Sequence, residues 1–209
     1  MENEIVHNFC ESRLNNYQAP EILNSYTSLF ITFIPLIYGL PKNNIFYNIS
    51  SLLIFNGFAS FYYHYTLSWF GKQADEVSMI LSVYFGIWRL ITLYYNENKN
   101  YYSGINTIFM TLTIIFNTFQ QNDLLFPLVF SIYVFVLLYH IYKTCELYNI
   151  TYKKELIISF IGAKCWIISE VYCNDVTKFG HIIWHIMFPL GFYKLILKFD
   201  KISHELLPR

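Results

Sequence analysis

Charged residues are scarce in this chain of 209 residues, where they make up 13% of the sequence, about half of the roughly 25% found in soluble globular domains. The 14 Lys and Arg are balanced by 14 Asp and Glu, so no basic field is present to hold a nucleic-acid backbone. The four cysteines are too few and too scattered for a disulfide scaffold or a CxxC metal site. These shortages exclude an ordinary soluble domain and a nucleic-acid-binding module.

Apolar residues, in contrast, are abundant at 55% of the chain, and aromatic residues make up 21%. This composition excludes disorder. A bilayer core about 30 Å thick needs about 20 apolar residues of helix, and the sequence contains seven such runs between polar breaks. They cover approximately residues 22–40, 45–65, 75–95, 104–120, 124–142, 155–173 and 181–199. The sequence therefore predicts an all-α integral membrane bundle of seven transmembrane helices.

The runs predict a single domain over residues 1–209, with a polar N-terminal segment at 1–21 and a short tail at 200–209. Three Lys and Arg residues fall on the N-terminal side of the predicted membrane, whereas ten fall on the opposite side. Because cytosolic loops carry the excess of basic residues, we expect a lumenal or extracellular N-terminus and a cytosolic C-terminus. The oligomeric state has no signature in the sequence.

Polar and ionisable residues inside membrane spans are energetically expensive, and they are therefore candidates for function. Odd-numbered runs start on the N-terminal side and even-numbered runs return to it. Six such residues are thus expected on the same face: Ser60, His64, Asp75, Glu76, His181 and His185. Within each of the pairs Ser60–His64 and His181–His185 the residues are four apart, which places both side chains on one helix face.

Two histidines on one helix face and a third from a neighbouring helix form the set that holds a catalytic zinc with one open position. His64, His181 and His185 are the candidate ligands. Asp75 would accept a proton from the water on the metal, and Ser60 would donate a hydrogen bond to an oxyanion. Simpler interpretations exist, since histidines at helix ends often meet headgroups, serines link helices and an Asp can cap a helix.

Three segments resemble the motifs of the alkaline ceramidases, a family of seven-span membrane hydrolases related to the adiponectin receptors. Segment 57–67, GFASFYYHYTL, resembles the family's GxxSxxxHxTL. Segment 73–79, QADEVSM, is similar to QxxDExxM with one residue fewer before the Asp, and segment 181–185, HIIWH, is similar to HxxWH. These motifs extend over most of the chain.

The resemblance implies that His64, His181 and His185 hold zinc and that Ser60 and Asp75 act in hydrolysis of a linear amide. The substrate would be ceramide in the bilayer, cleaved to a sphingoid base and a free fatty acid, in the endoplasmic reticulum or Golgi. Alternatives are a related hydrolase of another lipid amide or ester, a ligand-sensing receptor with a structural zinc, and a metal-free channel or transporter. A structural zinc normally has a fourth protein ligand, and the sequence offers no convincing one on that face.

The family also has an N-terminal calcium site, which the segments NFCE and EILN resemble. The resemblance implies Glu11, Glu21 and Asn8 as calcium ligands. Calcium requires several oxygen ligands, yet Asn8 replaces an acidic residue, Phe9 replaces a Trp, and Arg13 stands where an Asn ligand is expected. Two interpretations stay open, a weakened or absent calcium site and a capped, solvated segment.

Cys10 and Cys173 both fall on the predicted lumenal side, where disulfides form. Their pairing resembles a bridge expected in the family, and it would tie the N-terminal segment to the loop before the last run. Cys145 and Cys165 are expected to be free.

Overall fold

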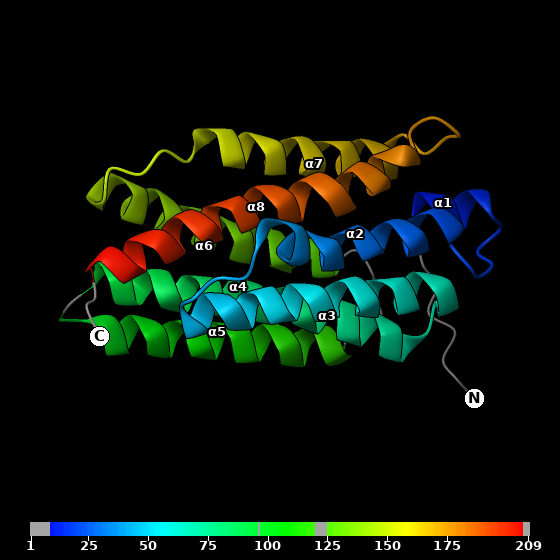
Figure 1. Ribbon diagram of the computed structural model, residues 1–209. Helices are drawn as coiled ribbons and strands as arrows, with labels where there is room; N and C mark the ends of the chain where they lie inside the picture. Colours follow the sequence, from blue (N-terminus) through cyan, green and yellow to red (C-terminus); the bar gives the residue numbers. More distant parts are fainter. Residues whose placement is uncertain (1–8, 96, 120–124, 207–209) are drawn as a thin grey trace.

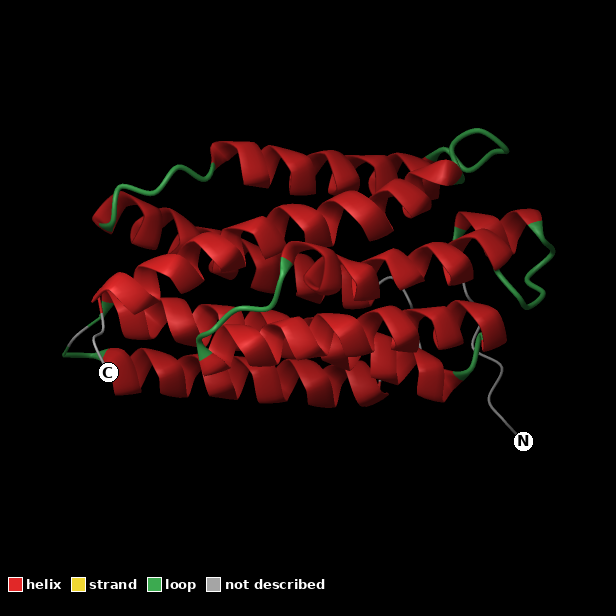
Figure 2. Ribbon diagram, in the orientation of Figure 1, coloured by secondary structure: helices red, strands yellow, loops and turns green. Residues whose placement is uncertain are grey.

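A computed structural model describes residues 9–95, 97–119 and 125–206, which form eight α-helices and no strand (Figure 2). The long helices run alongside one another, with the short α1 and the loop between α7 and α8 at one end and the end of α8 at the other (Figure 1). The all-α prediction is confirmed. The helices are α1 (Cys10–Leu14), α2 (Ile22–Tyr38), α3 (Asn44–Thr66), α4 (Trp69–Tyr94), α5 (Lys99–Phe119), α6 (Leu125–Leu147), α7 (Lys153–Val171) and α8 (Phe179–Leu206).

Four of these helices are long and apolar enough to cross a membrane: Asn44–Thr66, Trp69–Tyr94, Phe126–Leu147 and Phe179–Ser203. A fifth, α2, is apolar but shorter. The seven long helices match the seven apolar runs in order and position. The chain is therefore a helical membrane protein, and the number of helices that cross the bilayer stays a prediction.

The start of α4 differs from the sequence prediction, which placed a break before residue 75. The helix begins at Trp69, because the Ser68 side chain caps it by accepting a hydrogen bond from the Gly71 backbone N–H at 3.2 Å. Hydropathy detects the apolar part of a helix, and the polar first turns of α4 escape it. The same effect extends α5 back to Lys99.

The end of α8 is a second difference, since the helix continues to Leu206 through most of the segment predicted to be a tail. The Asp200 carboxylate accepts hydrogen bonds from the backbone N–H groups of Lys42 and Asn43, at 3.0 and 2.7 Å. These bonds tie the last turns of α8 to the loop between α2 and α3.

Large apolar side chains cover the outside of the bundle, as expected for a surface in lipid. Ile37, Phe70 and Phe119 expose 73%, 70% and 81% of their surface, whereas many polar side chains are buried between the helices. Small residues allow close helix contacts. A Cβ on Gly57 of α3 would lie 2.6 Å from the backbone nitrogen of Thr32 in α2.

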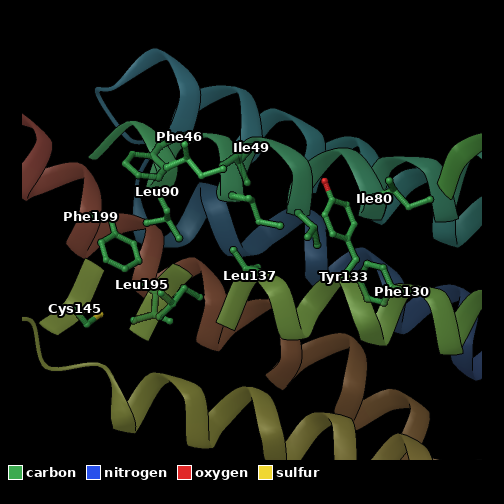
Figure 3. Close-up of a cluster of buried hydrophobic side chains, with 14 of the residues drawn as sticks. Phe46, Ile49, Ile80, Leu90, Phe130, Tyr133, Leu137, Cys145, Leu195 and Phe199 are labelled. Carbon is green, nitrogen blue, oxygen red and sulfur yellow. The ribbon is translucent and has the colours of Figure 1, made fainter. Parts of the chain in front are cut away.

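A cluster of buried apolar side chains joins α3, α4, α6 and α8 (Figure 3). The side chains point toward one another between the helices, and Ile80, Tyr133, Ile87 and Leu195 expose 1% or less of their surface. This apolar core cluster holds together the helices that carry the polar residues described next.

Candidate metal centre and active site

The three histidines predicted to bind zinc come together at the end of the bundle where α1 lies. His64 is in the last turn of α3, and His181 and His185 are one turn apart in the first turns of α8. All three are buried, and one ligand nitrogen from each lies within 4.8 Å of the others. In the described part of the chain, these three histidines form the group of His, Cys, Asp or Glu side chains that lie close enough together to hold a metal ion.

Each ring turns its Nδ1 atom outward to an oxygen of the protein. His64 Nδ1 lies 2.5 Å from Glu21 Oε2, and His185 Nδ1 lies 3.0 Å from Thr27 Oγ1. His181 Nδ1 lies 3.4 Å from Glu170 Oε1 in the last turn of α7, an ion-pair contact without hydrogen-bond geometry. Histidines that bind metals typically have such a partner on the other ring nitrogen. The Nε2 atoms are left for a common ligand, so the three residues fit a metal ion that accepts nitrogen ligands.

Glu21 is fixed at this position by several contacts. Its backbone N–H donates to the His64 carbonyl at 2.9 Å, and its carboxylate also accepts hydrogen bonds from Ser12 and, at 3.1 Å, from Asn24. Burial alone would raise the pKa of the Glu21 carboxyl, but the interaction with His64 and these hydrogen bonds lower the pKa to about 2. Glu21 is therefore an ionised acceptor for the His64 ring.

Ser60 and Asp75, the two predicted catalytic residues, are hydrogen-bonded to each other beside the histidines. Ser60 lies one turn before His64 in α3, with its hydroxyl 3.0 Å from that of Ser28 in α2. Asn56, a further turn back, donates from its side-chain amide to Asp75 Oδ1 at 2.8 Å. The Asp75 carboxylate is thus held in a fixed orientation.

An apolar cavity of about 380 Å³ opens onto this polar group. Ser60, Asp75 and the three histidines line one part of it, and mostly apolar side chains, the greater number of them from α3, α4, α6, α7 and α8, line the remainder. On α3 the lining extends from His64 back to Phe46, which corresponds to about 27 Å at 1.5 Å per residue. The candidate catalytic residues therefore lie at one end of a long, mainly apolar cavity.

Of the predicted calcium ligands, Glu11 and Glu21 lie in the described part of the chain, and both carboxylates accept hydrogen bonds from the protein. The two Glu11 carboxylate oxygens accept hydrogen bonds from backbone N–H groups in the first turn of α2, each at 2.8 Å. Glu21 faces His64 instead, and Asn8 lies outside the described residues. The Glu11 carboxylate therefore caps the first turn of α2.

The N-terminal segment lies directly against the histidines. A disulfide joins Cys10 of α1 to Cys173 in the loop before α8. The Phe9 ring packs on the rings of His181 and His64, with centroids 5.0 and 5.5 Å apart. Cys145 and Cys165 are free.

Several partners of the site were not identified from the sequence. Asn56 had a usable signal, because it precedes Ser60 and His64 at the same four-residue spacing on α3. Glu170 had a weak signal, since it stands next to the position where the resembling family has an acidic residue. Thr27 had none, because its contact with a histidine of another helix depends on how the helices are rotated.

The comparison with known families decides where the chain belongs. The family model described as Ceramidase matches residues 3–207. The chain belongs to the ceramidase family. The chain is 26% identical over 223 residues to alkaline ceramidase 1 of Mus musculus, and the match covers 90% of this chain and 78% of the mouse protein. It is 25% identical to human alkaline ceramidase 1, covering 90% and 81%, and 24% identical to the alkaline ceramidase of Caenorhabditis briggsae, covering 98% and 84%.

Proposed function

We propose that the protein hydrolyses the amide bond of ceramide inside the membrane, releasing a sphingoid base and a free fatty acid. The observation that carries the proposal is the convergence of three buried histidines with Ser60 and Asp75 at the polar end of an apolar cavity. We infer ceramide as the substrate because the related proteins are named alkaline ceramidases.

Zinc is the metal that we propose for this site, with His64, His181 and His185 as its ligands. Three protein ligands leave one position open, as in catalytic zinc sites. Zinc supplies a Lewis acid that polarises a carbonyl and lowers the pKa of bound water toward neutrality.

The protein residues move the protons. The Asp75 carboxylate takes a proton from the attacking water and delivers it to the sphingoid nitrogen as the C–N bond breaks. The Ser60 hydroxyl donates a hydrogen bond to the amide carbonyl oxygen, where negative charge develops. Asn56 keeps the Asp75 carboxylate aimed at the site through its 2.8 Å hydrogen bond.

The cavity accounts for the choice of a lipid substrate. Its apolar lining holds hydrocarbon chains and excludes water, and its length along α3 suits a long acyl or sphingoid chain. The amide of such a lipid would then lie at the level of Ser60 and Asp75.

For the orientation, we propose a lumenal or extracellular N-terminal segment and a cytosolic C-terminus, in the endoplasmic reticulum or Golgi. The disulfide between Cys10 and Cys173 supports this placement, because disulfides persist on the oxidising side of these membranes.

The proposal is tested with detergent-solubilised protein, measuring sphingoid base released from a panel of ceramides together with the zinc content. We expect about one zinc per chain in the wild type, and loss of both zinc and turnover in His185→Ala. His140→Ala is the matched control, because His140 is also a buried histidine but lies beside Tyr95 at the far end of α4. Full activity in His185→Ala would refute the proposal, whereas zinc without ceramide hydrolysis would favour another lipid amide or ester as substrate.

A further inference from the structure

The guanidinium group of Arg13 attaches α1 to the end of α7. Its Nη2 atom donates to the Glu170 backbone carbonyl at 2.6 Å and lies 3.2 Å from Glu170 Oε2. The same carboxylate oxygen accepts a hydrogen bond from the Cys10 backbone N–H at 2.8 Å. Glu170 therefore receives two donors from the N-terminal segment.

The other carboxylate oxygen of Glu170 faces the metal centre, 3.4 Å from His181 Nδ1. Arg13 thus holds one oxygen of the Glu170 carboxylate, and the other oxygen makes an ion-pair contact, without hydrogen-bond geometry, with the candidate metal ligand His181. Arg suits this role because it stays charged and its planar group donates several hydrogen bonds in fixed directions. An acidic partner on Nδ1 orients a metal-binding ring and raises its basicity.

A calcium ion does not fit the carboxylates of this segment. Glu11 is bonded to α2, Glu21 to His64 and Ser12, and Glu170 to Arg13 and Cys10. Calcium requires six to eight oxygen ligands around one point. The acidic side chains of the described residues form no metal-binding group of three, and a permanent positive charge already stands among them.

We propose that the Arg13 side chain does the work that a bound calcium ion would otherwise do, by attaching the N-terminal segment to the metal centre. Arg13 also positions His181, because it holds Glu170 beside that ring. Arg13 and Glu170 are positioning residues in this scheme. The second half of the proposal rests on the proposed function, since it assumes that His181 binds a metal.

The calcium half is tested on the purified full-length protein in calcium-free buffer. Equilibrium dialysis against radioactive calcium measures binding, and the melting temperature is measured with and without millimolar calcium chloride. We expect no bound calcium and an unchanged melting temperature. One calcium bound per chain, or a calcium-dependent rise in melting temperature, would overturn the proposal.

The positioning half is tested with Arg13→Ala and Arg13→Lys, following zinc release to a colorimetric chelator. We expect zinc to leave Arg13→Ala about tenfold faster than the wild type, and Arg13→Lys to restore part of the difference because it keeps the charge. The turnover number should fall while KM stays constant, because the cavity is intact. Lys178→Ala is the matched control, since Lys178 forms an exposed ion pair with Asp175 in the same region.

The two proposals fail in different ways. If the wild type holds zinc and Arg13→Ala holds it equally firmly, the positioning role is wrong and the metal centre stands. If the wild type binds no zinc, the metal centre and the positioning role are both wrong, while calcium binding and the melting temperature still decide how the N-terminal segment is docked.

Discussion

The histidine centre, formed by His64, His181, His185 and the residues that contact them, and the apolar core cluster are both buried, but different interactions hold them together. At the histidine centre almost every side chain has a named partner, as in the contacts of His64 with Glu21 and of His185 with Thr27. In the core cluster, side chains such as Ile80 and Ile87 are held by shape and volume alone. Replacing a single polar atom at the histidine centre should therefore change activity. Changing the volume of a side chain in the core cluster should change stability instead.

We expect the largest loss of turnover for Asp75→Asn, which removes the proton acceptor but preserves the shape of the side chain. Turnover of ceramide should fall about 100- to 10,000-fold, with zinc retained because Asp75 is not one of the three ligands. Asp175→Asn is the control, since this side chain is 88% exposed in the nearby loop. An Asp75→Asn enzyme with normal turnover would exclude Asp75 as the proton acceptor.

Ser60→Ala should lower turnover by about 100- to 1,000-fold, the cost of losing one donor to a developing oxyanion. Zinc content and the melting temperature should change little, since no histidine depends on the hydroxyl. Ser51→Ala on the same helix provides the comparison, because Ser51 is exposed and bonds only to the backbone one turn back. Equal turnover in the two serine variants would exclude Ser60 as the donor to the oxyanion.

Glu21→Gln tests whether a directional contact behind the metal ligand matters. Loss of the negative charge behind His64 should weaken zinc binding by about 10- to 100-fold, measured by competition with a chelator. Glu146→Gln serves as the control, because Glu146 is half exposed and its partners, Lys143 and Tyr142, lie on its own helix α6 and contact no histidine of the metal centre. Equal zinc affinities in the two variants would contradict the role given to Glu21.

The smallest effect on zinc and turnover is expected for Ile87→Ala in the core cluster. The cavity left by the side chain should lower the free energy of unfolding by about 2–5 kcal/mol, measured by denaturation in mixed micelles, with zinc content unchanged. Ile37→Ala should be nearly neutral, because Ile37 is 73% exposed on the outer surface. A loss of zinc in Ile87→Ala at low temperature would show that the two regions are not independent.

The part of the site that the sequence predicted follows from local geometry. Residues four apart share a helix face whatever the tertiary structure, so the pairs Ser60–His64 and His181–His185 could be identified directly. The common depth of these pairs and Asp75 followed from the alternating direction of the runs. Both predictions needed only the period of the helix and the thickness of a bilayer.

The other contacts of the site depend on how the helices pack, which no local sequence pattern predicts. Hydropathy does not fix the rotation of a helix about its axis, so the contact of Thr27 with His185 could not be predicted, and the partner of Glu170 could not be assigned. It also missed the polar turns at the start of α4, where a Ser68 cap rather than apolar character starts the helix. The resemblance identified Glu21 as a calcium ligand, and its contact with His64 was not predicted.

The disulfide between Cys10 and Cys173 has a topological consequence. The two residues are 163 positions apart, so α2 to α7 lie inside one covalently closed ring, with α8 attached as a branch. A protease that cuts any loop within that ring opens it without separating the pieces. Such nicked protein should run as one species on a non-reducing gel and divide into two only after a reductant is added.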